Sequence, residues 1–333
     1  MRELRVVYET GRDPVAWERE HALGNVPSRW PYGLDHLGNA VPTTAMAARP
    51  AGAVRRAVMA MRRDSASAGS AALTWDENAA VHLLPHSGVS RHTGVIWLTD
   101  QAAAGRDLRR RLAWLSGFTS AWVLSSAQVA PLERLLGSRA PRVDHVRFGV
   151  DHDFFGVQTY PESPLVLSVG GDRDRDTATL YRAMALVREA MPGMKIVVQT
   201  SSTLVPPAGV TRVDRLSHTE LRELYARASV VTIATRPNLH VSGMTVSLEA
   251  ASTGRPVVIT ATAGMSDYVV DGKTGIHVAP GDAEALAAQT ADLVRDPDKA
   301  RELGTAGRGF VSSARTTAHM CEELLHAIAG RRD

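Results

Sequence analysis

Short apolar runs alternate with segments of helical periodicity through the second half of the chain. The runs at residues 164–170, 194–200, 210–214, 230–235, 257–260 and 275–279 have the length of buried strands, and 210–214 is the weakest of them. Residues 177–191, 218–228, 245–253 and 283–294 are typical of helices. Strands that alternate with helices predict a parallel sheet covered on both faces. Two further helices, predicted near 299–310 and 316–329, are followed by no strand.

The first half repeats this rhythm more loosely. Strands are predicted at residues 4–8, 71–75, 94–98 and 121–125, and an arginine-rich helix between 106 and 115. Residues 12–42 hold several prolines and glycines and are expected to form a long loop with a short helix. We therefore expect an α/β chain with two doubly wound Rossmann-like domains, at residues 1–155 and 160–313, that face a cleft. A C-terminal helix at 314–333 is expected to pack back on the first domain.

Composition removes several classes of protein. Lysine and arginine total 38 against 35 acids, and the acids are interspersed among the bases, which argues against nucleic-acid binding. The single cysteine, Cys321, excludes an internal disulfide and a multi-thiolate metal site. No apolar run approaches the roughly 20 residues of a membrane span, and residues 1–10 lack the apolar core of a signal peptide. We expect a cytoplasmic protein without stable membrane insertion.

Glycine and arginine follow the first strand of the second domain, in the sequence GGDRDRD from Gly170 to Asp176. Glycine lets a backbone approach a ligand closely, and arginine can bind a phosphate through two parallel hydrogen bonds. The helix that follows offers free N–H groups to an anion. Because ligands bind at the carboxyl ends of such strands, this segment is a candidate anion site. The alternative is a solvated loop of paired charges.

A second candidate segment follows the fourth strand of that domain. Its N–H groups, from Ser242, Gly243, Met244 and Thr245, lie at the start of a helix and are candidates to bind an anion. The alternative is that Ser242 or Thr245 only caps the helix. Glu249 lies one turn further along the same face, where it is suited to accept hydrogen bonds from ribose hydroxyls. Otherwise it is an exposed helix acid, although its apolar neighbours predict burial, and a buried acid needs partners.

The run from Ser242 to Asp282 resembles the donor-binding half of GT-B glycosyltransferases of the family 4 type. It holds Leu-Glu-Ala, Gly-Arg-Pro-Val-Val, a glycine loop and Asp-Gly-Lys-Thr-Gly in the family's order. Residues 148–151 resemble the segment that ends the family's first domain, and residues 168–176 resemble its diphosphate-binding loop. Together these segments are distributed over residues 148–282 of the chain. The first domain matches only in outline.

The chain departs from the family at two positions. The family has two glutamates separated by seven residues; Glu249 matches the second, but Val241 stands at the first, with His240 beside it as the candidate replacement. In the diphosphate loop, Gly171 stands where arginine is usual. By spacing, Arg175 is the candidate for the family's basic residue and Arg173 is the alternative. Both departures leave the donor sugar open.

The resemblance implies a sugar transfer with retention at the anomeric carbon. The donor is a nucleotide-diphosphate sugar, and neither a metal ion nor another cofactor takes part. Arg175 and the amides of residues 242–245 would stabilise the departing diphosphate, which itself helps to take the acceptor's proton. Gly170, Gly171, Arg215 and Gly11 complete the donor-binding candidates.

The first domain would then bind the acceptor, a small molecule or a glycan. Asp100 is expected just beyond the strand at 94–98, where it could orient an acceptor hydroxyl, and Asp76 is placed in the same way after 71–75; either is otherwise a helix cap. Trp17, Trp30 and Tyr32 either stack on a ligand or pack down. His92 is expected to precede its strand and to be structural.

Two other functions remain open. A nucleotide-sugar epimerase of GT-B shape needs no acceptor, but generally carries more cleft acids and histidines than this set. A catalytically impaired nucleotide-sugar-binding protein is consistent with the missing first glutamate. A dinucleotide-dependent dehydrogenase is disfavoured because no Gly-x-Gly-x-x-Gly follows residues 4–8. A homodimer is a further expectation.

Overall fold

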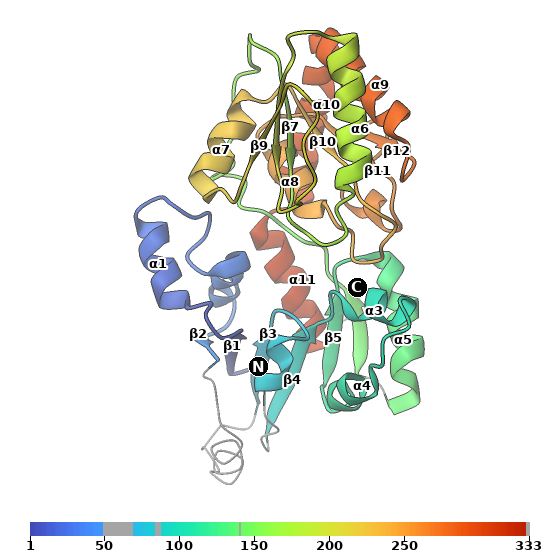
Figure 1. Ribbon diagram of the computed structural model, residues 1–333. Helices are drawn as coiled ribbons and strands as arrows, with labels where there is room; N and C mark the ends of the chain where they lie inside the picture. The colour runs from blue at the N-terminus through green and yellow to red at the C-terminus, as the bar shows by residue number, and fades with distance from the viewer. Residues whose placement is uncertain (49–68, 84–87, 140, 331–333) are drawn as a thin grey trace. The chain divides into compact units, whose positions relative to one another are not determined.

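The computed structural model describes residues 1–48, 69–83, 88–139 and 141–330 (Figure 1). The chain divides into two compact units. The first comprises Met1–Leu23, Ser28–Arg147 and Thr317–Asp333, and the second comprises Gly24–Pro27 and Phe148–Thr316. Each unit is built on one six-stranded sheet, as expected for an α/β chain with two Rossmann-like domains. Within the described ranges, no helix combines the length and the apolar character needed to cross a bilayer.

The sheet of the second unit is parallel throughout, with its strands in the order β12-β11-β10-β7-β8-β9. The strands are β7 (Leu165–Val169), β8 (Lys195–Gln199), β9 (Val210–Val213), β10 (Val230–Ile233), β11 (Val257–Thr260) and β12 (Ile276–Val278). This is the strand order of dinucleotide-binding sheets. The order reverses between β7 and β10, so the carboxyl ends of these two strands form the topological switch point, where such sheets bind ligands.

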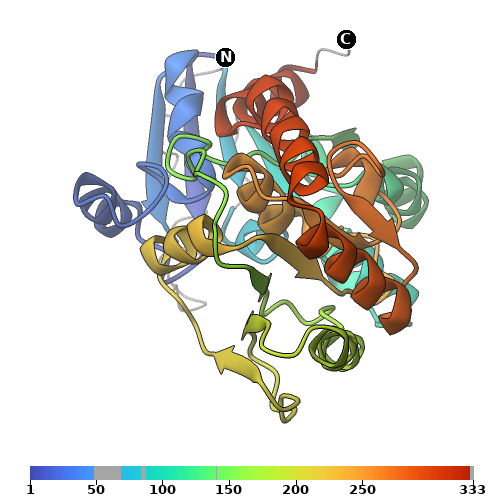
Figure 2. The same cartoon turned by 90° about the horizontal axis from the view of Figure 1, so that it is seen from above.

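Helices flank this sheet (Figures 1 and 2). They are α6 (Thr177–Ala190), α7 (His218–Arg227), α8 (Met244–Ser252), α9 (Ala283–Arg295) and α10 (Pro297–Ala314), with a 3-10 turn η4 (Met265–Asp267). Helix α6 packs against α9, and α10 packs against α8. Side chains such as Val166, Met184, Val198 and Leu286 fill one continuous core between helices and strands. Burial of these apolar faces is the main force that holds the unit together.

The sheet of the first unit is also parallel, in the order β2-β1-β3-β4-β5-β6. Its strands are β1 (Glu3–Tyr8), β2 (Thr43–Ala47), β3 (Ser70–Thr74), β4 (Val89–Gly94), β5 (Ser120–Val123) and β6 (Arg142–His145). Its helices are α1 (Pro14–Ala22), α3 (Leu98–Ala103), α4 (Arg109–Leu115), α5 (Ser126–Leu136) and α11 (Thr317–Ala329), and its 3-10 segments are η1 (Pro31–Asn39), η2 (Ala79–His82) and η3 (Gly137–Arg139). Helix α11 packs against η1. The strand order reverses between β1 and β3.

The structure corrects the prediction for residues 94–98. Strand β4 ends at Gly94, and Leu98 begins helix α3, so the apolar run fills the core beyond the strand. His92 lies within β4 rather than before it. Its two ring nitrogens lie 2.8 Å from the Ser120 hydroxyl and 2.9 Å from the Ser90 hydroxyl. The strand can hold buried polar side chains because they form hydrogen bonds to one another and to the neighbouring strand. Since it therefore lacks an apolar run, a search for apolar runs does not find it.

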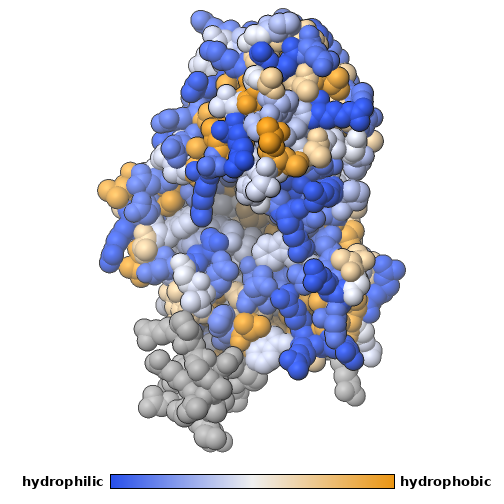
Figure 3. Space-filling model, in the orientation of Figure 1, coloured by the Kyte–Doolittle hydropathy of each residue, from blue (hydrophilic) through white to orange (hydrophobic). Residues whose placement is uncertain are grey.

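Other departures lie in the same unit. Residues 12–42, expected to be a loop with a short helix, hold both α1 and η1. Strands β2 and β6 and helices α3 and α5 were not predicted. The face drawn in Figure 3 is mostly polar, and its hydrophobic residues form small separate groups among the described residues. Scattered groups of this size are ordinary on a protein surface.

Candidate functional site

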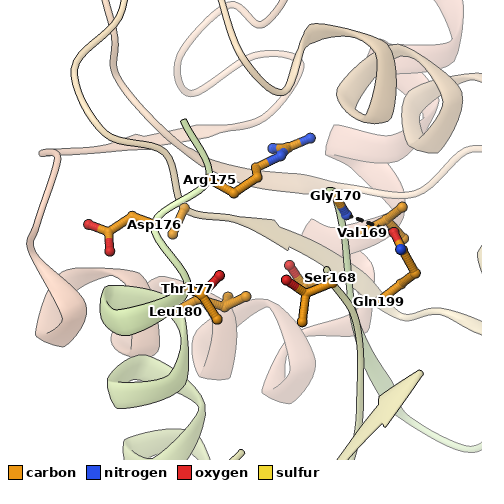
Figure 4. A pocket seen from close by; sticks show the side chains of 10 residues that line it. Ser168, Val169, Gly170, Arg175, Asp176, Thr177, Leu180 and Gln199 are labelled. Atoms are coloured by element: carbon orange, nitrogen blue, oxygen red, sulfur yellow. Dashed lines mark hydrogen bonds between the residues drawn. The ribbon is translucent and has the colours of Figure 1, made fainter. Parts of the chain in front are cut away.

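The loops that follow β7 and β10 meet at the switch point of the second unit. Backbone hydrogen bonds join them: the Asp176 amide donates to the Ala234 carbonyl at 3.0 Å, and the Arg236 amide donates to the Asp174 carbonyl at 2.8 Å. A small cavity of about 10 Å³ lies beside the first loop, lined by Gly170, Arg175 and Gln199 among others (Figure 4). This is space for about one water molecule.

Arg175 packs against two glycines, one from each loop. A Cβ atom at Gly170 would lie 2.2 Å from the Arg175 Nε, and a Cβ atom at Gly243 would lie 3.0 Å from the Arg175 Nη1. Both glycines have positive φ, at 155° and 103°. Both positions therefore favour glycine, because a larger residue would displace the guanidinium and strain the backbone. Figure 4 shows the guanidinium beside Gly170, whose amide donates to Gln199.

The Arg175 guanidinium holds hydrogen-bond donors that are not used within the described residues. Its Nε and Nη1 atoms are inaccessible to solvent and have no hydrogen-bond partner there, although the residue as a whole is only half-buried. Burial lowers the pKa of Arg175, whereas Asp172, Tyr225 and Glu249 act in the opposite direction. Arginine remains protonated under such a shift. A cation with buried, unpaired donors calls for an anionic ligand.

The three aspartates of the same loop are engaged elsewhere. Asp172 lies 3.4 Å from the His240 Nε2, and Asp174 lies 3.2 Å from the Arg173 Nε. Asp176 caps helix α6 by accepting a hydrogen bond from the Thr179 amide at 3.1 Å. No described acid forms an ion pair with Arg175, although the charge of Asp172 acts on it from nearby.

Helix α8 begins at the same place. Gly243 is its N-cap, and no side chain caps the helix. Of the amides proposed to bind an anion, that of Ser242 donates to the Asn238 Oδ1 at 2.9 Å, and that of Met244 donates to the Val241 carbonyl at 3.1 Å. The amide of Thr245 lies in the first turn of the helix, where no carbonyl four residues earlier within the helix can accept a hydrogen bond from it. The Ser242 hydroxyl is buried and has no hydrogen-bond partner among the described residues.

Val241, which stands where the family has its first glutamate, has an unusual backbone. Its φ is +55°, in the left-handed region, and the residue is fully buried. A β-branched residue in that region is a genuine outlier that costs about 1–3 kcal/mol. Val241 lies two residues before Gly243, and its carbonyl accepts the hydrogen bond from the Met244 amide.

Glu249 lies one turn into α8 and is only 9% exposed. Its Oε2 accepts a hydrogen bond of 2.8 Å from the hydroxyl of Tyr225, which lies on α7 and is fully buried. Burial raises the pKa of Glu249 to about 7, although the Tyr225 hydrogen bond and the Arg175 charge oppose this shift. The predicted burial of Glu249 is therefore observed, and Tyr225 is the partner that a buried acid requires.

His240 joins Asp172 and Asp174 in a compact group. One ligand atom from each lies within 4.8 Å of the others, the one group of this kind among the described residues that could hold a metal ion. Burial would raise the pKa of Asp172, but hydrogen bonds from His240 and from the Asp174 amide lower it to about 2.

The other candidates are placed as follows. Gly171 is exposed, and its carbonyl accepts a hydrogen bond from the Ser201 hydroxyl at 3.3 Å. Arg173 is paired with Asp174 and half exposed, and Arg215 is an exposed residue between β9 and α7. Among the described residues, neither Arg173 nor Arg215 forms a hydrogen bond or an ion pair with Glu249. Asp100 lies in the first turn of α3, not at the end of a strand, because β4 ends at Gly94.

The switch point of the first unit carries a second cluster. Gly11 and Arg12 follow β1, and the Arg12 guanidinium lies 4.9 Å from the ring centre of Tyr32. The other contact of that ring is with Trp75 after β3, at 4.2 Å and 12°. Tyr32 is therefore packed between two side chains, which favours the structural alternative for this aromatic. Asp76 caps the following turn through the amides of residues 78 and 79, and burial raises its pKa.

Comparison with known proteins shows what the second unit is similar to. Residues 163–296 match the family described as glycosyl transferases group 1. The chain is 26% identical over 239 residues to glycogen synthase of Mycobacterium tuberculosis, which is 67% of this chain and 56% of that protein. It thus spans about half the length of the curated relatives that it matches first.

Solved structures match over nearly the whole chain. Sucrose-phosphate synthase from Thermosynechococcus elongatus superposes with a TM-score of 0.74 at 18% identity, covering 99% of both chains. Anabaena Alr3699/HepE, solved in complex with UDP-glucose, gives a TM-score of 0.69 at 13% identity, covering 98% of this chain and 99% of that one. The fold is GT-B, and residues 163–296 of the second unit match the glycosyl transferases group 1 family. The resemblance to GT-B glycosyltransferases found in the sequence is confirmed at this level.

Proposed function

We propose that the protein transfers a sugar from a nucleotide-diphosphate sugar to an acceptor, with retention at the anomeric carbon and without a metal ion. The observation that carries the proposal is the Arg175 guanidinium, whose buried donors have no partner among the described residues and lie at the switch point of the sheet. The group 1 glycosyl transferase domain supports it independently. So do the relatives, because glycogen synthase is named for joining sugars.

The proposed reaction breaks the bond between the anomeric carbon and the diphosphate and forms a bond from that carbon to the acceptor. The nucleoside diphosphate leaves with the electron pair, and its phosphate oxygen takes the acceptor's proton. Arg175 and the first turn of α8 lie where they can stabilise the negative charge that develops on the diphosphate. Loss of one such donor typically slows a reaction by about 10²–10³-fold.

Glu249 is proposed to bind the ribose of the donor. It lies close enough to Arg175 for their charges to interact, on the same helix whose first turn faces the diphosphate. An ionised carboxylate accepts hydrogen bonds from hydroxyls but cannot donate them. Since the pKa of Glu249 is about 7, we expect ribose binding to strengthen as pH rises through neutrality.

Metal independence is tested most directly at the Asp172, Asp174 and His240 group. If the reaction needs a divalent ion, this group is the candidate binding site for that ion among the described residues. EDTA should leave the transfer rate unchanged, and Asp172→Asn should not create a requirement for magnesium or manganese. A complete loss of activity with EDTA that manganese restores would overturn the metal-free mechanism.

The acceptor is proposed to bind the first unit, as a small molecule or a glycan. The candidate residues are Gly11, Arg12 and Asp76, which follow β1 and β3 at the switch point of that unit. Asp76 has one oxygen engaged in capping and a raised pKa, so it is the candidate to orient an acceptor hydroxyl.

Calorimetry with UDP, GDP, ADP and TDP, followed by their sugars, tests the donor site. We expect one nucleoside diphosphate to bind, and Glu249→Ala to weaken that binding by about 10–100-fold, as for loss of hydrogen bonds to a charged group. A thermal melt of the variant checks that it folds. Absence of binding by the intact protein to every one of these nucleotides would refute the proposal. Acceptor-dependent release of nucleoside diphosphate separates a transferase from an epimerase, which converts the donor without acceptor, and from a binding protein, which releases none.

A further inference from the structure

Tyr225 and Glu249 form a buried pair between two helices of the second unit. Tyr225 ends the apolar face of α7, and Glu249 lies in α8. The hydroxyl donates to the Glu249 Oε2 at 2.8 Å, with Tyr225 fully buried and Glu249 9% exposed. A hydrogen bond to a charged acceptor at this depth is strong because water does not compete for it.

The hydrogen bond uses only one of the two carboxylate oxygens. Among the described residues, no hydrogen bond to the Glu249 Oε1 is recorded, while Oε2 is held by the tyrosine. An ionised carboxylate can accept at both oxygens. Fixing Oε2 therefore restricts rotation of the carboxylate plane and leaves Oε1 to accept from a ligand.

Tyr225 is itself held at two further points. The backbone carbonyls of Tyr225 and Ala226 accept hydrogen bonds from the buried Arg255, at 2.9 Å from Nε and 2.9 Å from Nη2. Phe155 meets the tyrosine ring edge-on, with centroids 5.9 Å apart and planes at 80°. A side chain fixed at its backbone, ring and hydroxyl is a rigid support for the group that it contacts.

We propose that Tyr225 is a positioning residue that acts through Glu249: its hydroxyl holds the Glu249 carboxylate in the orientation and the ionised form that bind the ribose hydroxyls of the donor. This inference rests on the proposed function, because it takes Glu249 as the ribose ligand. Tyr225 does not contact the donor itself in this account.

Tyr225→Phe tests the inference, since it removes one oxygen atom and keeps the ring. The nucleotide used is whichever of UDP, GDP or ADP binds. The readout is the dissociation constant of its 2′,3′-dideoxy form divided by the dissociation constant of its ordinary form. Both are measured by calorimetry from pH 5.5 to 9. Titration of the phosphates affects both nucleotides and cancels in the ratio. In the unmodified protein the ratio should rise with a midpoint near pH 7, the pKa of Glu249.

In Tyr225→Phe the midpoint should move upward by about one pH unit, because a hydrogen bond to the ionised form is lost. At pH 7 this gives up to about a fivefold smaller ratio, which recovers at pH 9. A merely structural role would lower affinity for both nucleotides equally and leave the midpoint unchanged. Glu249→Gln should make the ratio small and independent of pH, and Tyr225→Phe should add little in that background.

Tyr181→Phe is the matched control. Tyr181 is also a buried tyrosine of this unit, and its hydroxyl has no hydrogen-bond partner among the described residues. The ratio and its midpoint should therefore match those of the unmodified protein. An unmoved midpoint and an unchanged ratio in Tyr225→Phe would overturn the inference. The proposed donor site would still stand in that case, provided that the unmodified protein binds the ordinary nucleotide more tightly than the dideoxy form. A ratio near one at every pH in the unmodified protein would instead remove Glu249 as the ribose ligand.

Discussion

Gly170→Ala is the change that tests most sharply whether the position of Arg175 matters. The added Cβ would lie 2.2 Å from the Arg175 Nε and 2.6 Å from its Cζ. Non-bonded atoms of this kind prefer a separation of about 3.5–4.0 Å, so the guanidinium has to retreat by more than about 1 Å. The side chain can do so because it is flexible, which means that the substitution moves the charge without deleting it.

The magnitude follows from this displacement. A hydrogen bond stretched beyond about 3.5 Å is effectively lost, and a misplacement of about 1 Å can cost about 100-fold in rate. We therefore expect transfer to slow by about 10²–10³-fold, as for removal of one charge-stabilising donor. Stability should fall by about 1–3 kcal/mol, because alanine is strained at a φ of +155°.

The assay compares initial rates of nucleoside diphosphate release with thermal unfolding of the same samples. The double variant Gly170→Ala/Arg175→Ala should be no slower than Arg175→Ala alone, since both changes remove the same contact. Gly309→Ala controls for the substitution type, because nothing lies within 4 Å of its Cβ position. A folded Gly170→Ala protein that keeps the full rate would refute the reasoning, because the guanidinium would then act from any position or not at all.

Two other predictions concern the arginines of the loop and the packing of α10. Arg175→Ala should slow transfer by two or more orders of magnitude, about as for loss of one charge-stabilising donor. Arg173→Ala should have a small effect, because its half-exposed side chain is paired with Asp174. The reverse ranking of initial rates would contradict the assignment. Gly304→Ala should lower the free energy of unfolding by about 1–3 kcal/mol, since its Cβ would lie 2.1 Å from the Gly254 carbonyl oxygen, where α10 packs on α8. Gly309→Ala in the same helix should raise the free energy of unfolding by about 0.5–1 kcal/mol. Equal denaturant midpoints for the two variants would contradict the packing argument.

The strands of the second unit could be predicted because each is a short apolar run between glycine, proline or polar residues. Strand β11 was placed at its observed bounds, and β7 and β10 within one or two residues. In the first unit the same rule failed at β4, whose sequence is VSRHTG. Thr93 and Thr74 share a hydrogen bond of 2.8 Å across two strands, and His92 bonds to Ser120. A strand whose buried polar groups satisfy one another carries no apolar signal, so only the tertiary structure shows it.

The same limit applies to the site. Glu249 could be found because an acid among apolar neighbours is conspicuous in a helix. Tyr225 could not, since Leu221, Leu224 and Tyr225 are equally consistent with a simple apolar helix face. The signal that was available is chemical: a buried acid needs a donor, and tyrosine is the buried side chain best able to supply one while it packs as an apolar residue.

The GGDRDRD loop shows why a charge pattern alone leaves two interpretations open. With three acids and two arginines, the sequence is equally consistent with mutual neutralisation. In the structure Asp172 pairs with His240, Asp174 pairs with Arg173, and Asp176 caps α6. Each acid thus has a partner other than Arg175, whose guanidinium packs against Gly170 and Gly243. If this distribution is what keeps Arg175 available for a phosphate, then His240→Ala, which releases Asp172, should weaken nucleoside diphosphate binding. Unchanged affinity in a folded His240→Ala protein would show that Asp172 is held away from Arg175 by the backbone alone.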